Sequence, residues 1–293
     1  MVNGYRFRGF TLIELIIVIV LIGIVAVMVS QILSRPFMAY RDTSERAELV
    51  TMATNAINHM AEELRTAVPN TIRVADDQVL EFVPIRYAGR YRDGNPGDKN
   101  ALSVNIPDKE FNNLGNIDDS SGYRLVIYNT GVSGFYNRIN GGSPANRGPV
   151  TAPDNTVTIE DCDTATCGDT VTVDHITLSK SHRFDSVGSG SPSHRFYLFN
   201  YGVVYHCNPN TGTNNIMRYE DYDFTTSQVT SRSTLSASAT RTAPLLEHVT
   251  ACSFSFDPGN SSYRSATVQI QITLQDDRNT VQLAREVHIW NVP

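Results

Sequence analysis

The chain has 293 residues, 41% hydrophobic and 18% charged, a length that suffices for one large or two small domains with a buried core. Its formal net charge is −6, and the two cations near the start, Arg6 and Arg8, leave the remainder more negative still. This balance excludes binding of nucleic acid or anionic lipid through the overall electrostatic field, so we expect no nucleic-acid partner.

The first 30 residues, MVNGYRFRGFTLIELIIVIVLIGIVAVMVS, differ from the polar remainder. Residues 10–29 are long enough to cross a membrane, and Glu14 is the one charged residue among them. A cleavable secretory signal accounts for the basic start but not for the poor cleavage site at Ala26–Met28. Neither this signal nor a plain anchor explains Glu14, because a carboxylate within a membrane helix costs a few kcal/mol.

Cleavage between Gly9 and Phe10 supplies a partner for Glu14. The new α-amine of Phe10 is then a cation about one helical turn away. In an assembly of parallel, staggered helices, Glu14 of one subunit can meet the amine of a neighbour, and in a medium of low dielectric constant this pairing fixes the axial register. The segment then serves assembly as well as anchoring.

The residues RGFTLIELIIVIVLIGIVAV resemble the class III signal of type IV pilins and type II secretion pseudopilins. The resemblance is residue by residue from Gly9 to Glu14, and Gly23 matches a glycine often found within that helix. It implies a leader of residues 1–9, cleavage after Gly9 by a prepilin peptidase and N-methylation of Phe10. It also implies other minor and major pilins and the inner-membrane assembly platform as partners.

A long helix is expected from Phe10 to Val68, roughly 90 Å in length, with Pro36 as the site of a kink. Beyond the membrane its apolar residues recur at spacings of three and four, which predicts one face packed on a core. That predicted face consists of Val50, Ala53, Ile57, Met60 and Leu64. The sequence Val68-Pro69-Asn70 is expected to end the helix.

From residue 71 onward the pattern is that of short β-strands. We expect strands at residues 71–74, 78–83, 123–128, 171–178, 195–206, 216–219, 251–256, 266–274 and 281–290. Residues 131–150 and 231–242 are expected to be loops. The predicted fold is α+β: a long N-terminal helix, hydrophobic and then amphipathic, packed on an antiparallel sheet with loop insertions. The expected division is a leader (1–9), the helix (10–70) and a β-rich body (71–293).

The body resembles the larger minor pilins, the PilW-like and J-type group that includes MSHA-pilus biogenesis proteins. The resemblance rests on MAEELRTAVPNTIRV at residues 60–74 and on SATVQIQITLQ and REVHIWNVP within residues 265–293. Residues 85–190 contribute little to it.

The four cysteines, in a chain that begins with an export signal, predict two disulfides. Three pairings are open; we expect Cys162–Cys167, which encloses a short loop, and Cys207–Cys252, which ties two strands together. Metal binding by the first pair is the competing interpretation.

Enzyme motifs are missing from the sequence: it has no nucleophile elbow, HExxH motif or phosphate loop, so we expect no catalytic residues, no cofactor and no metal. Acidic residues gather at Glu160, Asp161, Asp163 and Asp169 around the short cysteine loop. A solvated acidic loop is favoured over a calcium site, since the glycine and terminal glutamate of an EF-hand loop are missing.

One stretch after the second strand interleaves arginines with tyrosines: Arg86, Tyr87, Arg90, Tyr91 and Arg92. A solvated loop is the favoured interpretation, with a subunit interface or a recognition patch as alternatives.

Taken with the resemblance, these features predict a minor pilin that acts in priming or tip assembly of an MSHA-like type IV pilus. The expected location is the inner membrane through residues 10–29, with the body in the periplasm and later in the pilus fibre or at its tip. The alternatives are a J-type pseudopilin of a type II secretion system and a tip adhesin that uses the loops of residues 85–150.

Overall fold

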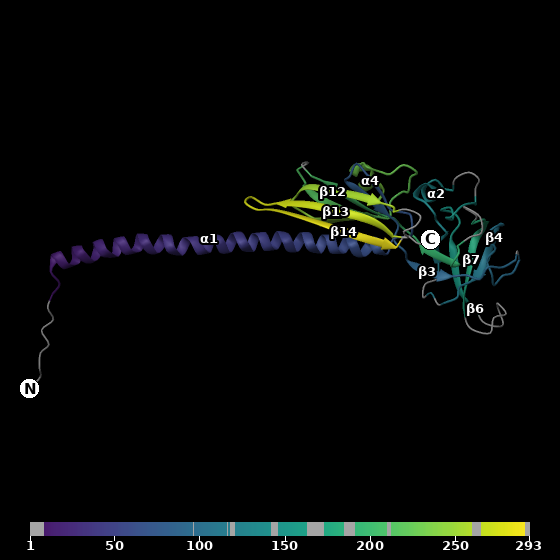
Figure 1. Ribbon diagram of the computed structural model, residues 1–293, viewed down its shortest axis with the longest axis horizontal. Coiled ribbons are helices and arrows are strands. Elements are labelled where there is room, and N and C mark those ends of the chain that lie inside the picture. The colour runs from purple at the N-terminus through teal and green to yellow at the C-terminus, as the bar shows by residue number, and fades with distance from the viewer. Residues whose placement is uncertain are drawn as a thin grey trace, which may run out of the picture.

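The computed structural model describes residues 9–95, 97–115, 117, 121–141, 146–162, 173–184, 191–209, 212–259 and 265–290. Figure 1 shows a long N-terminal helix that projects from a β-rich body. This arrangement confirms the predicted α+β class with its antiparallel sheets.

Helix α1 runs from Leu12 to Arg65, 54 residues and roughly 81 Å. It begins at Thr11, whose side chain accepts a hydrogen bond from the backbone N–H of Glu14 (3.4 Å), a typical N-cap. The helix continues through Pro36. It ends at Arg65, with Thr66 as its C-cap, three residues before the expected end at Val68.

The buried face of α1 differs from the predicted face at its first residue. Leu49 is 3% exposed, whereas Val50, which we expected in the core, is 37% exposed. The remaining predicted positions are buried, and small alanines fill the face between them. The buried residues of this helix face are Leu49, Ala53, Ala56, Ile57, Met60, Ala61 and Leu64.

Among the described residues, three antiparallel sheets replace the single sheet that we expected. The five-stranded sheet has the order β1 (Arg73–Ala75), β2 (Val79–Phe82), β9 (Val203–Asn208), β10 (Asn215–Glu220), β11 (Arg241–Leu246). The three-stranded sheet consists of β12 (Val249–Asp257), β13 (Ser265–Gln275) and β14 (Thr280–Trp290). The six-stranded sheet has the order β3 (Tyr87–Arg90), β8 (Arg195–Phe199), β5 (Ser121–Ile127), β6 (Val157–Cys162), β7 (Val173–His182), β4 (Asp108–Asn112).

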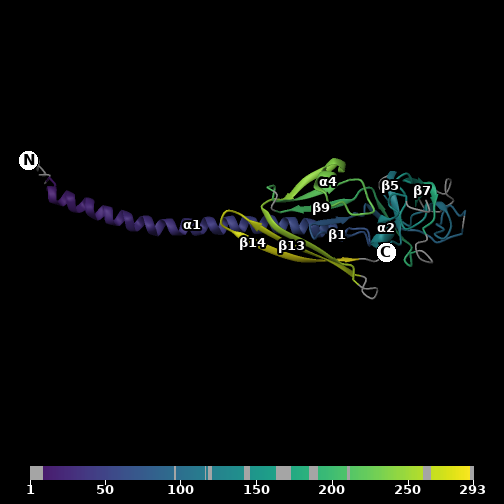
Figure 2. The same ribbon diagram turned by 90° about the horizontal axis from the view of Figure 1, so that it is seen from above.

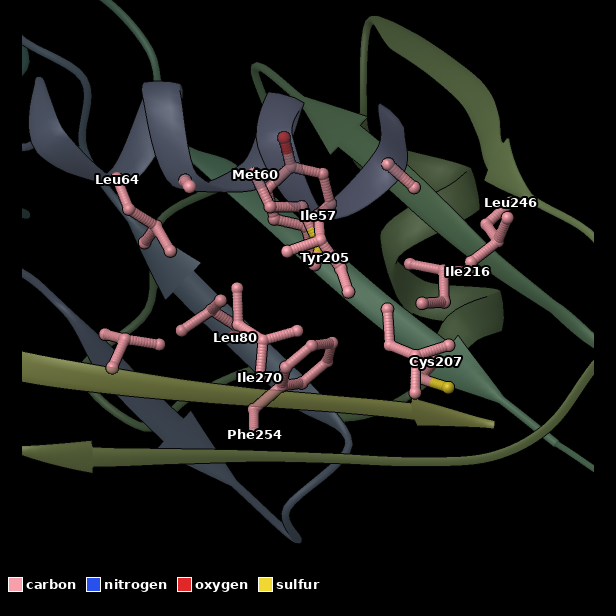
Figure 3. Packing of buried hydrophobic residues seen from close by; sticks show 14 of the residues in the cluster. Ile57, Met60, Leu64, Leu80, Tyr205, Cys207, Ile216, Leu246, Phe254 and Ile270 are labelled. Atoms are coloured by element: carbon pink, nitrogen blue, oxygen red, sulfur yellow. The ribbon is translucent and has the colours of Figure 1, made fainter. Parts of the chain in front are cut away.

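The main core lies where α1 meets the five-stranded and three-stranded sheets. Figure 3 shows Ile57, Met60 and Leu64 of the helix directed toward side chains of these sheets, such as Leu80 of β2 and Phe254 of β12. The hairpin of β13 and β14 lies along α1 in both Figure 1 and Figure 2. The second half of α1 is therefore fixed by packing on two sheets.

The six-stranded sheet is an insert within the five-stranded sheet. Strands β2 and β9 pair directly, with Val79 opposite His206 and Phe82 opposite Val203, although residues 83–202 lie between them in sequence. The first and last strands of the insert, β3 and β8, also pair with each other, so its two ends meet. Figure 1 and Figure 2 both place the insert at the end of the molecule opposite the N-terminus.

Several local expectations were wrong in detail. Residues 195–206 form two strands, β8 and β9, separated by a turn. Helix α2 (Val132–Tyr136) lies within the expected loop 131–150, and helix α4 (Arg232–Ser238) lies within the expected loop 231–242. Leu235 of α4 is fully buried against the outer face of the five-stranded sheet, which explains why this Ser/Thr/Ala-rich segment is ordered.

Candidate assembly site

The first half of α1 has no partner within the chain. Residues Leu12–Ser30 have a mean hydropathy of 3.3 and none of them is buried. Across the described residues, this is the one helix that is long and apolar enough to cross a membrane. Single-pass anchoring in the inner membrane fits both its length and its exposure.

Exposed apolar side chains continue beyond that span. Phe37, Met38 and Tyr40 are 62% exposed or more, and the buried face of α1 begins only at Leu49. The first ion pair between α1 and the body joins Asp42 to Arg278 in the turn between β13 and β14. About 30 residues of helix, roughly 45 Å, therefore project from the body. Such an extended apolar surface requires either lipid or other helices to cover it.

Gly9, Phe10 and Glu14 lie together at the free end of this helix. Gly9 and Phe10 precede the N-cap and are exposed, and nothing lies within 4 Å of where a Cβ on Gly9 would be. Glu14 lies in the first turn, where the positive end of the helix dipole favours a carboxylate. The structure thus leaves the peptide bond after Gly9 open to solvent and places Glu14 one turn from Phe10.

The interleaved arginine and tyrosine stretch is mostly a strand rather than a loop. In β3 and its flanks the arginines Arg86, Arg90 and Arg92 are exposed, whereas the tyrosines face the core of the insert. Tyr91 is 1% exposed and its ring meets Phe111 edge-on. The alternation of a β-strand therefore separates the two residue types, and Tyr91 is unavailable for stacking on a ligand.

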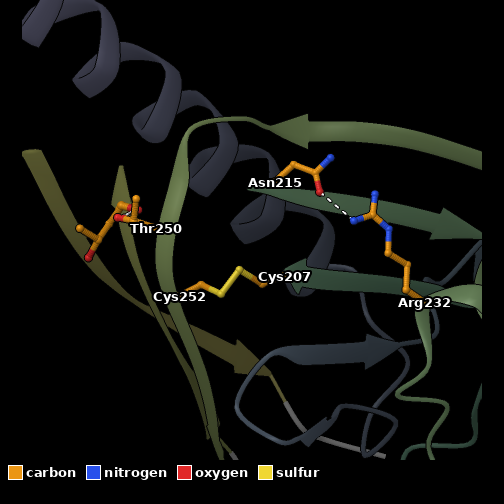
Figure 4. Close-up of a disulfide and its surroundings, with 6 residues drawn as sticks. Cys207, Asn215, Arg232, Thr250 and Cys252 are labelled. Carbon is orange, nitrogen blue, oxygen red and sulfur yellow. Dashed lines mark hydrogen bonds between the residues drawn. A yellow bond between two sulfur atoms is a disulfide. The ribbon is translucent and has the colours of Figure 1, made fainter. Parts of the chain in front are cut away.

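A disulfide joins Cys207 of β9 to Cys252 of β12, as Figure 4 shows. It connects the five-stranded sheet to the three-stranded sheet beside α1, the pairing that we expected between two strands. The other expected pair, Cys162–Cys167, lies outside the described residues, since Cys162 is described only as the last residue of β6.

The acidic cluster near that cysteine pair is described only in part. Glu160 and Asp161 are exposed on β6, and Asp163 and Asp169 lie outside the described residues. Within the described part of the chain, no group of three or more His, Cys, Asp or Glu side chains is placed to hold a metal ion.

Sequence reasoning missed a polar contact that holds α1 on the body. Glu63, which lies beside the predicted apolar face, accepts hydrogen bonds from Arg218 of β10 (2.9 Å between Nη2 and Oε1) and from the hydroxyl of Tyr205. Burial alone would lower the pKa of Arg218, but its hydrogen bonds to Glu63 and Glu220 raise that pKa above its usual range. The only signal in the sequence was an acid beside the apolar stripe.

Comparison with known protein families finds one match, and it lies at the assembly site. Residues 5–30 match the family described as the prokaryotic N-terminal methylation motif. Neither the curated proteins nor the solved structures contain a significant match to the chain. The motif, followed by a single apolar helix and a β-sheet body, indicates a type IV pilin-like prepilin.

Proposed function

We propose that this protein is a minor pilin that acts in priming or tip assembly of an MSHA-like type IV pilus. The observation that carries the proposal is the methylation motif at the free end of a helix whose first half is wholly exposed and apolar. Such a segment serves in a membrane before assembly and in a helical filament core afterwards. Within the PilW-like group, the assignment that we propose is the MSHA-pilus biogenesis protein MshO.

Assembly requires processing and then charge pairing. A prepilin peptidase cuts between Gly9 and Phe10, which removes the leader 1–9, and Phe10 is N-methylated and keeps its positive charge. Glu14 then pairs with the Phe10 amine of an adjacent subunit. Since both charges lie in a medium of low dielectric constant, an unpaired one is strongly disfavoured, and only correct axial register satisfies both. The chain acts as a structural component and not as a catalyst.

The position of the insert supports a place at the filament tip. In a filament of parallel helices, subunits stack along the direction of α1, and the insert lies at the end of the body away from the helix N-terminus. A subunit stacked above would meet this insert, whereas a subunit at the apex has no neighbour there. The body, residues 71–293, then stands in the periplasm and later at the cell surface, with residues 10–70 as anchor and filament core.

The proposed partners follow from this cycle: the prepilin peptidase, other minor and major pilins, and the inner-membrane assembly platform. A J-type pseudopilin of a type II secretion system uses the same processing and the same helix. The pilus role and the secretion role are therefore distinguished by the phenotype of a gene deletion. Deletion of the gene should abolish or sharply reduce surface pili and leave protein secretion intact. Loss of secretion with normal piliation would favour the pseudopilin.

Processing is tested by mass spectrometry of protein extracted from membranes. The expected N-terminus is N-methylated Phe10. Gly9→Ala should be cleaved far better than Gly9→Leu, because the peptidase must accept a small side chain at the cut. An intact Met1, or a cut near Ala26, would contradict the pilin assignment.

A further inference from the structure

A polar cleft of about 410 Å³ lies where the insert meets the five-stranded sheet. The insert contributes Tyr123 of β5, and Arg86 comes from the segment that leads into β3. The opposite wall comes from the ends of β10 and β11, with Glu220, Asp221 and Arg241. Clefts between two such units, lined by a few convergent polar groups and of this volume, are common sites for small ligands.

Backbone hydrogen bonds fix the position of Asp221 in the wall of the cleft. Its N–H donates to the carbonyl of Gly202 (3.1 Å), and its own carbonyl accepts from the N–H of Thr240 (3.0 Å). Gly202 is required there, because a Cβ would lie 2.5 Å from the ring of Phe224. Asp221 has a φ of 56°, a conformation that aspartate and asparagine tolerate better than other side chains. The cleft is therefore preformed rather than dependent on a mobile loop.

The charges around the cleft are compensated within the protein. Glu220 accepts hydrogen bonds from Arg218 (2.6 Å) and Arg241 (3.3 Å), and Asp221 accepts one from the hydroxyl of Thr240 (2.8 Å). Two guanidinium groups and two carboxylates line the cleft, so its net charge is balanced. A charged ligand would have to compete with these existing pairs.

We propose that this cleft binds a neutral saccharide of one or two sugar units. Each sugar hydroxyl both donates and accepts a hydrogen bond, and the cleft offers acceptors on Glu220 and Asp221 beside donors on Arg86 and Arg241. Tyr201 is partly exposed and adds an aromatic ring with a polar tip, suited to the apolar C–H face of a sugar ring, whereas Tyr123 is 4% exposed and only borders the cleft. The inference is independent of filament assembly, because binding is a property of the single chain.

The test uses the full-length chain purified in lauryldimethylamine N-oxide, because a detergent with a sugar headgroup would occupy the cleft. Probes are immobilised neutral oligosaccharides ending in glucose, galactose, mannose or N-acetylglucosamine, together with sialylated and sulfated glycans. At least one neutral probe should bind saturably. Asp221→Asn, which keeps shape and backbone conformation, should weaken that binding about tenfold or more. Asp277→Asn, in the exposed turn between β13 and β14, is the matched control and should bind like the wild type.

Arg241→Gln provides a second variant, from the strand next to β10 in the same wall of the cleft, and should weaken the same binding. Circular dichroism and the intact Cys207–Cys252 bridge verify that each variant is folded. The proposal is overturned if no neutral glycan binds, if only sialylated or sulfated glycans bind, or if folded Asp221→Asn and Arg241→Gln variants bind like the wild type. N-terminal processing and pilus entry of Asp221→Asn should stay at the wild-type level, so failure here is separate from failure of the pilin assignment.

Discussion

Arg73 of β1 and Glu81 of β2 form a two-point ion pair, with distances of 2.8 Å from Nε to Oε2 and 2.9 Å from Nη2 to Oε1. Glu81 is fully buried, and Tyr222 also donates to its carboxylate. The guanidinium of Arg73 lies 3.5 Å from the centre of the Tyr136 ring, which belongs to α2 in the insert. This pair therefore joins the five-stranded sheet to the insert.

Glu81→Gln should lower the free energy of unfolding by about 3 to 5 kcal/mol, because it leaves the largely buried Arg73 cation without its counter-charge. Pulse proteolysis of the full-length protein in increasing urea measures the change. Glu45→Gln is the control: Glu45 pairs with Arg41 on exposed α1, and the loss should stay within about 0.5 kcal/mol. Equal effects of the two variants would contradict the role of the Arg73–Glu81 pair.

The adjacent residues Leu49 and Val50 test the register of α1 on the body. Leu49→Ala should cost about 2 to 4 kcal/mol of stability, because Leu49 is 3% exposed and its removal leaves a cavity. Val50→Ala should change stability by less than about 0.5 kcal/mol, because Val50 is exposed. Both are measured by the same urea assay. A larger effect at Val50 would favour the face predicted from sequence.

That difference of one residue shows the limit of what helical spacing alone can predict about the buried face of α1. Positions 49 and 50 lie four and three residues before Ala53, so helical spacing admits both as the first apolar contact. Only packing against the sheets selects Leu49. The same limit applies to Glu63, since the partner that draws it inward, Arg218, is far away in sequence.

Most of the described strands were predictable one by one, because alternation and turn residues are local signals, but β3, β4, β6 and β11 were missed. The expected strands 71–74 and 78–83, for example, leave a short turn between them, and Asp76 and Asp77 in that turn have the positive φ that such turns use. Their assembly into three sheets was not predictable, because the pairing of β2 with β9 joins residues on either side of the whole insert. At the assembly site the motif from Gly9 to Glu14 was readable because the chemistry is contained in consecutive residues.

Removal of the disulfide by the double change Cys207→Ala and Cys252→Ala should cost roughly 3 to 4 kcal/mol. The two cysteines are 45 residues apart, and the cross-link restricts the unfolded chain accordingly. Urea unfolding under matched conditions measures the loss. Peptide mapping without reductant should recover a linked Cys207–Cys252 peptide pair, and also the predicted Cys162–Cys167 bridge. A peptide linking Cys162 to Cys207 would contradict both.

Alkaline pH should destabilise the insert through Tyr91. Burial raises the pKa of this phenol to about 12 from an ordinary value of 10.0. The unfolded chain releases the proton first, so the stability that the neutral phenol contributes is intact below pH 10 and is lost as the pH rises toward 12. Tyr91→Phe should reduce the fall of the urea midpoint over this range. Tyr40→Phe, at a residue that is 74% exposed, should leave the fall unchanged.

Glu14→Val should separate membrane insertion from assembly. Loss of the carboxylate makes the helix more apolar, so insertion should be retained or improved. The body should fold normally, because its apolar core contacts with α1 begin at Leu49, roughly 52 Å along the helix from Glu14. A Phe10 amine in the filament core, however, loses its counter-charge, so incorporation should fall at least several-fold.

The variant is expressed in a strain without the native gene, and membrane and sheared-pilus fractions are compared. Glu48→Ala, on the same helix but beyond the apolar run, should enter pili normally. If Glu14→Val enters pili at the wild-type level, charge pairing at this position is not what admits the subunit to the filament.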